Sequence, residues 1–163
     1  MRPDQAINLN PIADFLHAPV AIDVAGASPS NRPLLTRGLG CRVLDEGRQL
    51  CVFVSQPRSK ALLDTLQIGS RIAAVFCLPS TEQAIQIKGL ITDIRPLTAA
   101  EQETLSACQH GFAAAIACLG YSAEFSANYR YAADCVSLII TPHDIYEQTP
   151  GPLAGSRLSR PVS

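Results

Sequence analysis

The sequence predicts a small closed β-barrel of six mostly antiparallel strands with two helices outside the sheet. Apolar runs of strand length recur along the chain, and turn residues join adjacent runs into two hairpins. The spacing of apolar residues becomes helical in only two segments. Adjacent hairpins favour antiparallel pairing, so a doubly wound sheet is the weaker alternative.

The strands are predicted from alternation and turn chemistry. Gly38 and Gly40 indicate a bend or bulge where a side chain would collide with a close neighbour. Residues 45–47 (DEG) supply a hairpin turn. The run 71–78 (RIAAVFCL) is expected to be buried on both faces, whereas 83–94 alternates as a half-buried strand does. The predicted strands are residues 19–25, 32–44, 49–55, 71–78, 83–94 and 135–141, with 145–146 as an extension of the last.

Two helices are predicted from their start and stop signals. The first is a short helix of about three turns that begins at Pro57 and stops at Gly69. The second begins at Thr98, which forms a capping box with Glu101, and ends at Gly120. Its apolar stripe is Leu105, Cys108, Phe112, Ala115, Ile116 and Leu119.

Composition predicts one ordinary domain and limits the partners. The chain has 163 residues, of which 47% are hydrophobic and 17% charged, enough apolar matter for one core. The net charge of -1 gives no overall attraction to nucleic acid or anionic lipid, so neither is expected as a partner. No secretory signal or membrane span is recognised, and a cytoplasmic location is expected. We expect an N-terminal segment 1–18, a barrel domain 19–147 and a tail 148–163.

The cysteines and histidines do not indicate a metal site. The six cysteines include no Cys-x-x-Cys pair, and most lie in apolar runs, so we expect reduced thiols that pack as small buried hydrophobes. The three histidines lie far apart in sequence. No arrangement typical of a Ser/His/Asp triad or of paired acids is present, and no catalytic residue is assigned.

Three short motifs resemble those of the pyridoxamine 5'-phosphate oxidase-like family. Residues 32–38 (RPLLTRG) resemble the Arg-x-Val-Leu-Leu-Lys-Gly strand of these oxidases. Residues 53–60 (FVSQPRSK) resemble the next strand and its Ser-Arg-Lys turn, and residues 86–89 (QIKG) resemble the Val-Arg-Val-Glu-Gly strand. Element order agrees from about residue 19 to 146. The resemblance implies a six-stranded antiparallel split barrel of the type that binds flavin mononucleotide (FMN).

The resemblance also implies where FMN would bind. Arg32 or Arg37 together with Lys60 would contact the phosphate, and the backbone of residues 34–36 and 54–55 would lie along the isoalloxazine ring. Two cations suit a dianionic phosphate, because charge-assisted hydrogen bonds are the strong ones. The candidate FMN-binding residues are Arg32, Leu34, Leu35, Thr36, Arg37, Val54, Ser55, Arg58, Ser59, Lys60 and Gln86.

The chain departs from the oxidases at two places. Ala84 stands where they carry a ring-contacting glutamine, so Gln83 or Gln86 would have to substitute for it. The tail lacks their substrate-binding arginine and histidine pattern, so a true pyridoxamine 5'-phosphate oxidase is not expected. Residues 148–155 (QTPGPLAG) form either a rigid turn that covers a neighbour's site or an irregular terminus.

Three functions follow from the resemblance. The first is an FMN-dependent oxidoreductase that acts on an unidentified small molecule, in which the flavin supplies the redox chemistry and the protein supplies orientation. The alternatives are a non-catalytic module that stores flavin or another ligand, and a flavin reductase. Flavins in this superfamily sit between two subunits, so the resemblance implies a homodimer with its site at the interface.

Overall fold

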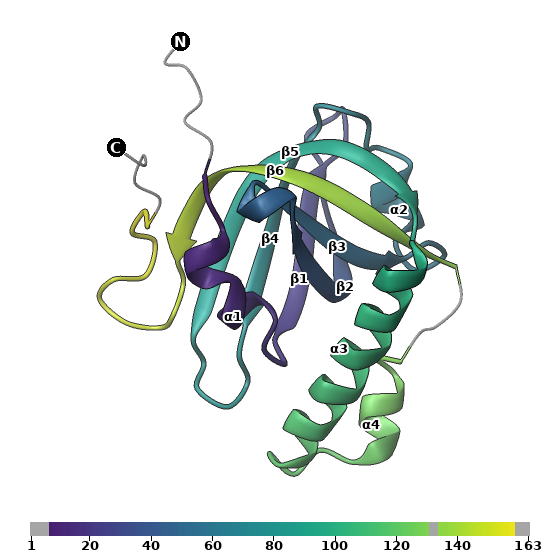
Figure 1. Ribbon diagram of the computed structural model, residues 1–163. Helices are drawn as coiled ribbons and strands as arrows, with labels where there is room; N and C mark the ends of the chain where they lie inside the picture. Colours follow the sequence, from purple (N-terminus) through teal and green to yellow (C-terminus); the bar gives the residue numbers. More distant parts are fainter. Residues whose placement is uncertain (1–6, 131–133, 159–163) are drawn as a thin grey trace.

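Six antiparallel strands close into a barrel in the computed structural model, which describes residues 7–130 and 134–158 (Figure 1). The strands are β1 (Ala21–Ala27), β2 (Pro33–Leu44), β3 (Gln49–Ser55), β4 (Arg71–Cys77), β5 (Ala84–Pro96) and β6 (Cys135–Glu147). Their order around the barrel is β1-β2-β3-β6-β5-β4, closed by pairing of β1 with β4. The predicted fold class is confirmed, and the doubly wound sheet is wrong. Residues 1–6 and 159–163 of the predicted end segments lie outside the described residues.

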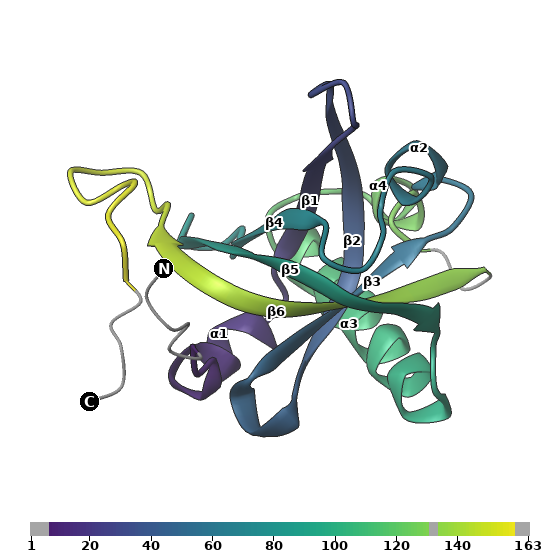
Figure 2. The same cartoon turned by 90° about the horizontal axis from the view of Figure 1, so that it is seen from above.

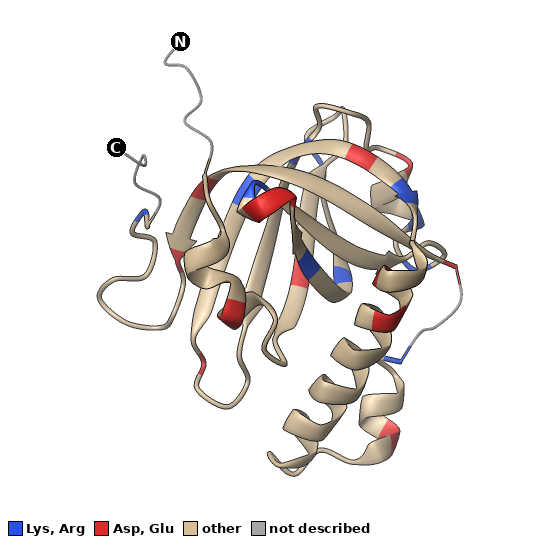
Figure 3. Ribbon diagram, in the orientation of Figure 1, with Lys and Arg blue, Asp and Glu red and all other residues tan. Residues whose placement is uncertain are grey.

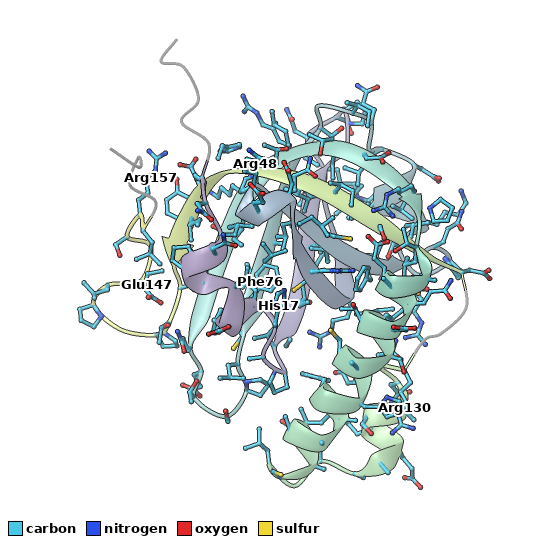
Figure 4. All side chains as sticks on the ribbon, in the orientation of Figure 1. His17, Arg48, Phe76, Arg130, Glu147 and Arg157 are labelled. Atoms are coloured by element: carbon cyan, nitrogen blue, oxygen red, sulfur yellow. The ribbon has the colours of Figure 1, made fainter. Side chains whose placement is uncertain are left out.

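The barrel interior is filled by alternate side chains of the strands. On β4, Ile72, Ala74 and Phe76 are buried in the core, and Phe76 points into the barrel (Figure 4). The side chains between them, Ala73 and Val75, remain partly exposed on the outer face. The prediction that this strand is buried on both faces is therefore wrong, because its outer face carries small apolar residues that no core covers.

The helices cover one side and one end of the barrel. A 3-10 turn (Asn10–Ile12) and α1 (Ala13–Leu16) follow Leu9, and both Leu9 and Leu16 are buried in the barrel core. Helix α3 (Ala99–Ala117) packs Leu105 against the outer face of β3 and β6, then extends past the barrel with α4 (Ala123–Ala127) beside it (Figure 1). Its predicted capping box is confirmed, whereas α4 was not predicted. No helix among the described residues is long and apolar enough to cross a membrane.

The first predicted helix is much shorter than expected. Helix α2 spans only Lys60–Leu63, and turns replace the rest of the predicted run from residue 57 to 69. The apolar spacing was misleading because Ile68, which continues the helical pattern, is 66% exposed. The hydroxyl of Thr65 also donates to the carbonyl of Leu62 at 2.7 Å, which satisfies a carbonyl group at the helix end.

The predicted bend in β2 is confirmed at its two glycines. The pairing with β3 shifts register between Gly38 and Gly40. A Cβ added at Gly40 would lie 2.8 Å from the Cβ of Cys108, so the missing side chain lets α3 approach the strand. A Cβ at Gly38 would lie 2.6 Å from Ile22 Cγ2. Both glycines are therefore required by close packing.

A buried carboxylate fixes the start of α3. The side chain of Glu101 is 2% exposed and forms a two-point pair with Arg95, with N···O distances of 2.7 and 2.8 Å. The Thr98 backbone N–H and the Ser137 hydroxyl also donate to it, at 2.9 and 3.0 Å. The hydrogen bonds from Arg95 are the main reason that the pKa of Glu101 falls to about 2. This cluster joins α3 to β5 and β6.

The six cysteines differ in exposure. Cys41 and Cys51 are buried as predicted, and burial raises the pKa of the Cys51 thiol to about 12. Cys77, Cys108 and Cys135 are half-buried, and all six are free thiols. Cys118 is exposed near the end of α3, so the prediction of burial is wrong there.

Substitution of Gly89 with alanine is expected to destabilise the barrel. At this position β5 shifts register opposite Pro142, and an added Cβ would collide with the carbonyl oxygen of Thr141 and lie 2.6 Å from Ile140 Cγ2. We expect a loss of about 1–3 kcal/mol in the free energy of unfolding, measured by urea unfolding. The control is G111A on α3, where an added Cβ meets nothing within 4 Å. It should stabilise the protein by about 0.5–1 kcal/mol, and a G89A variant as stable as G111A would contradict this account.

Candidate functional site

A row of side chains crosses the outer face of four neighbouring strands. In register, Arg37 on β2 lies opposite Asp23 on β1. Asp23 lies opposite Val75 on β4, which in turn lies opposite Gln86 on β5. Directly opposed residues of antiparallel strands share a face of the sheet. We call these four residues the Arg37–Gln86 row.

The middle of this row, on β1 and β4, is bordered by small side chains on the curved outer wall of the barrel. The outer-face positions beside it on β1 and β4 are occupied by small residues, which remain partly exposed: Ala21, Ala25, Ala73 and Cys77. On β2, the side chain of Leu35 is 70% exposed. These strands carry both basic and acidic residues (Figure 3), and Lys88 on β5 lies opposite Ala73. A planar group could therefore contact the short side chains of β1 and β4 beside the row.

A hollow of about 270 Å³ adjoins the Arg37 end of the row. It brings two cations, Arg37 and Arg58, together with the hydroxyl-bearing residue Ser55. Its full lining is Leu35, Thr36, Arg37, Leu39, Ser55, Arg58, Asn128 and Tyr129. The lining contains no carboxylate, so the hollow is suited to an anion.

The segment after α4 holds both arginines in position. The Arg37 guanidinium lies 4.8 Å from the ring centroid of Tyr129 and 3.4 Å from the carboxylate of Asp23. The Nη1 group of Arg58 donates to the carbonyl of Asn128 at 2.8 Å. Tyr129 is in turn held by ring contacts with Phe112 and Phe125. The two cations are thus oriented by neighbouring groups before any ligand binds.

Other candidate residues face the core. The hydroxyls of Thr36 and Ser59 lie 2.6 Å apart in a buried hydrogen bond. Val54 is fully buried, and Leu34 packs against the core. For residues 34–36 and 54–55 the expectation concerned the backbone, so these side-chain placements leave it as a prediction.

Arg32 and Lys60 lie outside the lining of the arginine hollow. Lys60 Nζ pairs with Asp64 at 2.7 Å and lines a different hollow with Gln56 and Pro57. Arg32 precedes β2 at the projecting β1–β2 turn (Figure 2), where its backbone N–H donates to Ser28 Oγ at 3.1 Å. Of the predicted cations, the structure brings Arg37 and Arg58 together.

A second hollow, of about 570 Å³, lies at the Gln86 end of the row. Its lining is Val75, Cys77, Glu82, Ala84, Gln86, Gln148 and Pro150. The tail reaches it because the Gln148 N–H donates to the carbonyl of Ala84 at 2.8 Å and the Ala84 N–H donates to Thr149 Oγ1 at 3.0 Å. A second carboxamide, that of Gln148, thus lies beside Ala84.

The described part of the tail is an ordered turn. After β6 the chain folds back, so that Arg157 forms a bridge with Tyr146 and an ion pair with Asp144. Glu147 and Arg157 mark the two sides of this turn in Figure 4. Residues 148–155 thus form bends and turns held by hydrogen bonds to β5 and β6, and the expectation that they cover a neighbour's site stays a prediction.

Sequence reasoning missed several residues of the site, among them Asp23, Val75, Asn128, Tyr129 and Gln148. A signal for the α4 segment was present, since Ser122 caps the helix by accepting from the N–H of Phe125 at 3.1 Å. Asp23 and Gln148 gave no local signal, because their places depend on strand register and on the return of the tail.

The barrel is similar to several solved structures, although no protein-family model matches the chain and no curated protein matches its sequence. An F420 reductase aligns with a TM-score of 0.53 at 20% identity, over 81% of this chain and 93% of that chain. A putative pyridoxamine 5'-phosphate oxidase from Lactobacillus delbrueckii gives 0.51 at 12% identity, over 85% and 93%. HupZ from Group A Streptococcus gives 0.50 at 16% identity, over 89% and 97%. The predicted split-barrel fold is confirmed.

Proposed function

We propose that this split barrel binds FMN along the Arg37–Gln86 row and acts, as a homodimer, as an FMN-dependent oxidoreductase on a small molecule. The observation that carries the proposal is the continuity of the site. A hollow with two arginines opens at one end of the row, and two carboxamides lie at the other. The short side chains of β1 and β4 between these two ends suit a planar ring.

The arginine hollow fits the phosphate of FMN. A dianionic phosphate requires two or more cations with additional donors, because charge-assisted hydrogen bonds are about twice as strong as neutral ones. Arg37 and Arg58 supply the charge, and Ser55 supplies a hydroxyl in the same lining. Arg32 and Lys60 remain secondary candidates for this role.

The rest of the row fits the remainder of the cofactor. Three strand spacings separate Arg37 from Gln86, about 14 Å along the curved barrel wall. Val75 and its small neighbours would lie under the ring, and the carboxamides of Gln86 and Gln148 can pair with its polar edge. A bound flavin would supply hydride and one-electron chemistry, while the chain's residues hold and orient it.

Catalysis is favoured over storage by the open hollow at the Gln86 end. Its volume of about 570 Å³ leaves room for a second small molecule beside the ring position. A second copy of the chain would cover the exposed side chain of Leu35 and exclude water from the flavin. The family resemblance supports such a dimer, with the site at its interface.

The proposal predicts a yellow dimer. The purified protein, mixed with FMN and then desalted, is expected to keep the visible absorption bands of flavin and to elute from size exclusion at twice the chain mass of 17.4 kDa. A colourless protein after desalting would contradict FMN binding.

The flavin-reductase alternative predicts rapid oxidation of reduced nicotinamide cofactor with free FMN as acceptor, and we expect that assay to be negative.

A further inference from the structure

Asp23 lies in the middle of the Arg37–Gln86 row without an assigned role. Its neighbours on the outer face of β1 are Ala21 and Ala25, and its partner across β4 is Val75. Among the described residues of the row, it is the one that carries a negative charge. A ligand that extends from Arg37 along the row lies over Asp23 first.

A structural role does not account for this carboxylate. The contact between Arg37 Nη1 and Asp23 Oδ1 is 3.4 Å long, and the side chains are 36% and 51% exposed. Exposed pairs of this kind contribute little to stability. Aspartate is also unfavourable within a strand. Within residues 7–130 and 134–158, no hydrogen bond to the second oxygen, Oδ2, is present.

The chemistry of a carboxylate defines what can lie above it. An ionised carboxylate accepts hydrogen bonds and donates none, and it repels phosphate. Asp23 is not among the residues that line the arginine hollow, although its carboxylate lies 3.4 Å from the Arg37 guanidinium. The part of a ligand that lies over Asp23 must therefore present hydrogen-bond donors, such as hydroxyl groups, to the carboxylate.

We propose that Asp23 is a specificity residue that recognises the sugar-alcohol hydroxyls between the phosphate and the ring of the ligand. This inference rests on the proposed function. The same carboxylate lowers the attraction of Arg37 for a bare phosphate. Asp23 therefore selects polyol phosphates that carry a planar ring over inorganic phosphate.

The test compares D23A with wild type for three probes: FMN, riboflavin and inorganic phosphate. Removal of the acceptor should lower the affinity for riboflavin about tenfold, as expected for loss of a hydrogen bond to a charged group. The affinity for FMN should fall by a smaller factor. Removal of the negative charge should raise the affinity for inorganic phosphate about threefold at low salt. Flavin binding is followed by fluorescence titration, and phosphate binding by its competition with FMN.

The matched control is D93A. Asp93 is also an exposed strand aspartate, 54% exposed, with an arginine contact of 3.7 Å to Arg95, and it lies outside the row. D93A should change none of the three affinities. If wild type retains FMN but D23A shifts riboflavin and phosphate in the same direction, or leaves riboflavin unchanged, the role of Asp23 is overturned and the proposed function stands. A wild-type protein that binds no flavin overturns both.

Discussion

The double substitution R37A/R58A is expected to weaken FMN binding by roughly 10² to 10⁴-fold, because each charge-assisted contact contributes about 1.5–3 kcal/mol. Both guanidinium groups line the same hollow, and removal of both leaves a phosphate there without a cation. The lost contacts are those to the phosphate, which riboflavin lacks, so the affinity for riboflavin should change much less. Fluorescence titration with FMN and with riboflavin measures the two effects separately.

Two controls make this result specific. R48A removes an exposed arginine (Figure 4) that pairs with Asp45 at 2.7 Å in the β2–β3 turn. Arg48 lines neither hollow of the row, so this variant should leave FMN affinity unchanged. The pair R32A/K60A removes the two cations that lie outside the hollow, and its effect should be within a few-fold. Loss of FMN binding in R32A/K60A but not in R37A/R58A would show that the phosphate lies elsewhere.

Substitution of Glu101 with alanine is expected to cost about 3 kcal/mol of unfolding free energy, as breakage of a buried ion pair does. The substitution removes the two-point partner of Arg95, which keeps its 3.7 Å contact with Asp93, and it removes the acceptor of the Thr98 N–H and the Ser137 hydroxyl. For a chain of this size the melting temperature should fall by about 6–12 °C. Urea unfolding followed by circular dichroism measures the loss. The control is E103Q, an exposed glutamate on the same helix, which should be neutral.

The carboxylate of Glu101 also makes the free energy of unfolding depend on pH, and the lowered pKa gives the direction of the change. The pKa of Glu101 is lowered from 4.5 to about 2 in the folded protein, so its contribution to stability is fully present above about pH 4.5. It is lost as the pH falls from there towards 2. Because E101Q cannot titrate, the difference in unfolding free energy between wild type and E101Q should shrink over this interval. A difference that stays constant between pH 6 and pH 3 would contradict the role of the charge.

Much of the barrel was predictable because its signals are local. The alternation in β5 and the capping box of Thr98 and Glu101 each lie within a few residues of sequence. The burial of Leu9 and Leu16 was not predictable, since it depends on the shape of the open barrel end. Ile68 shows the opposite error, an apolar residue at helical spacing that remains exposed.

The site was predictable only in part. The candidates Arg37, Ser55 and Arg58 come from β2, from the end of β3 and from the turn that follows β3, and the structure brings them into one hollow. The alignment of Arg37 with Gln86 depends on the registers of three strand pairs, and β2 also carries a bulge at its glycines. No local pattern encodes a register of that kind, so Asp23 could not be placed between them from the sequence.

The most direct test of the account is a crystal structure of the protein with FMN. The account predicts that the phosphate lies within hydrogen-bond distance of both Arg37 and Arg58, with the ring over Val75 and its polar edge at Gln86. Flavin bound at another surface, or a phosphate that contacts Arg32 and Lys60 instead, would contradict the assignment of the Arg37–Gln86 row.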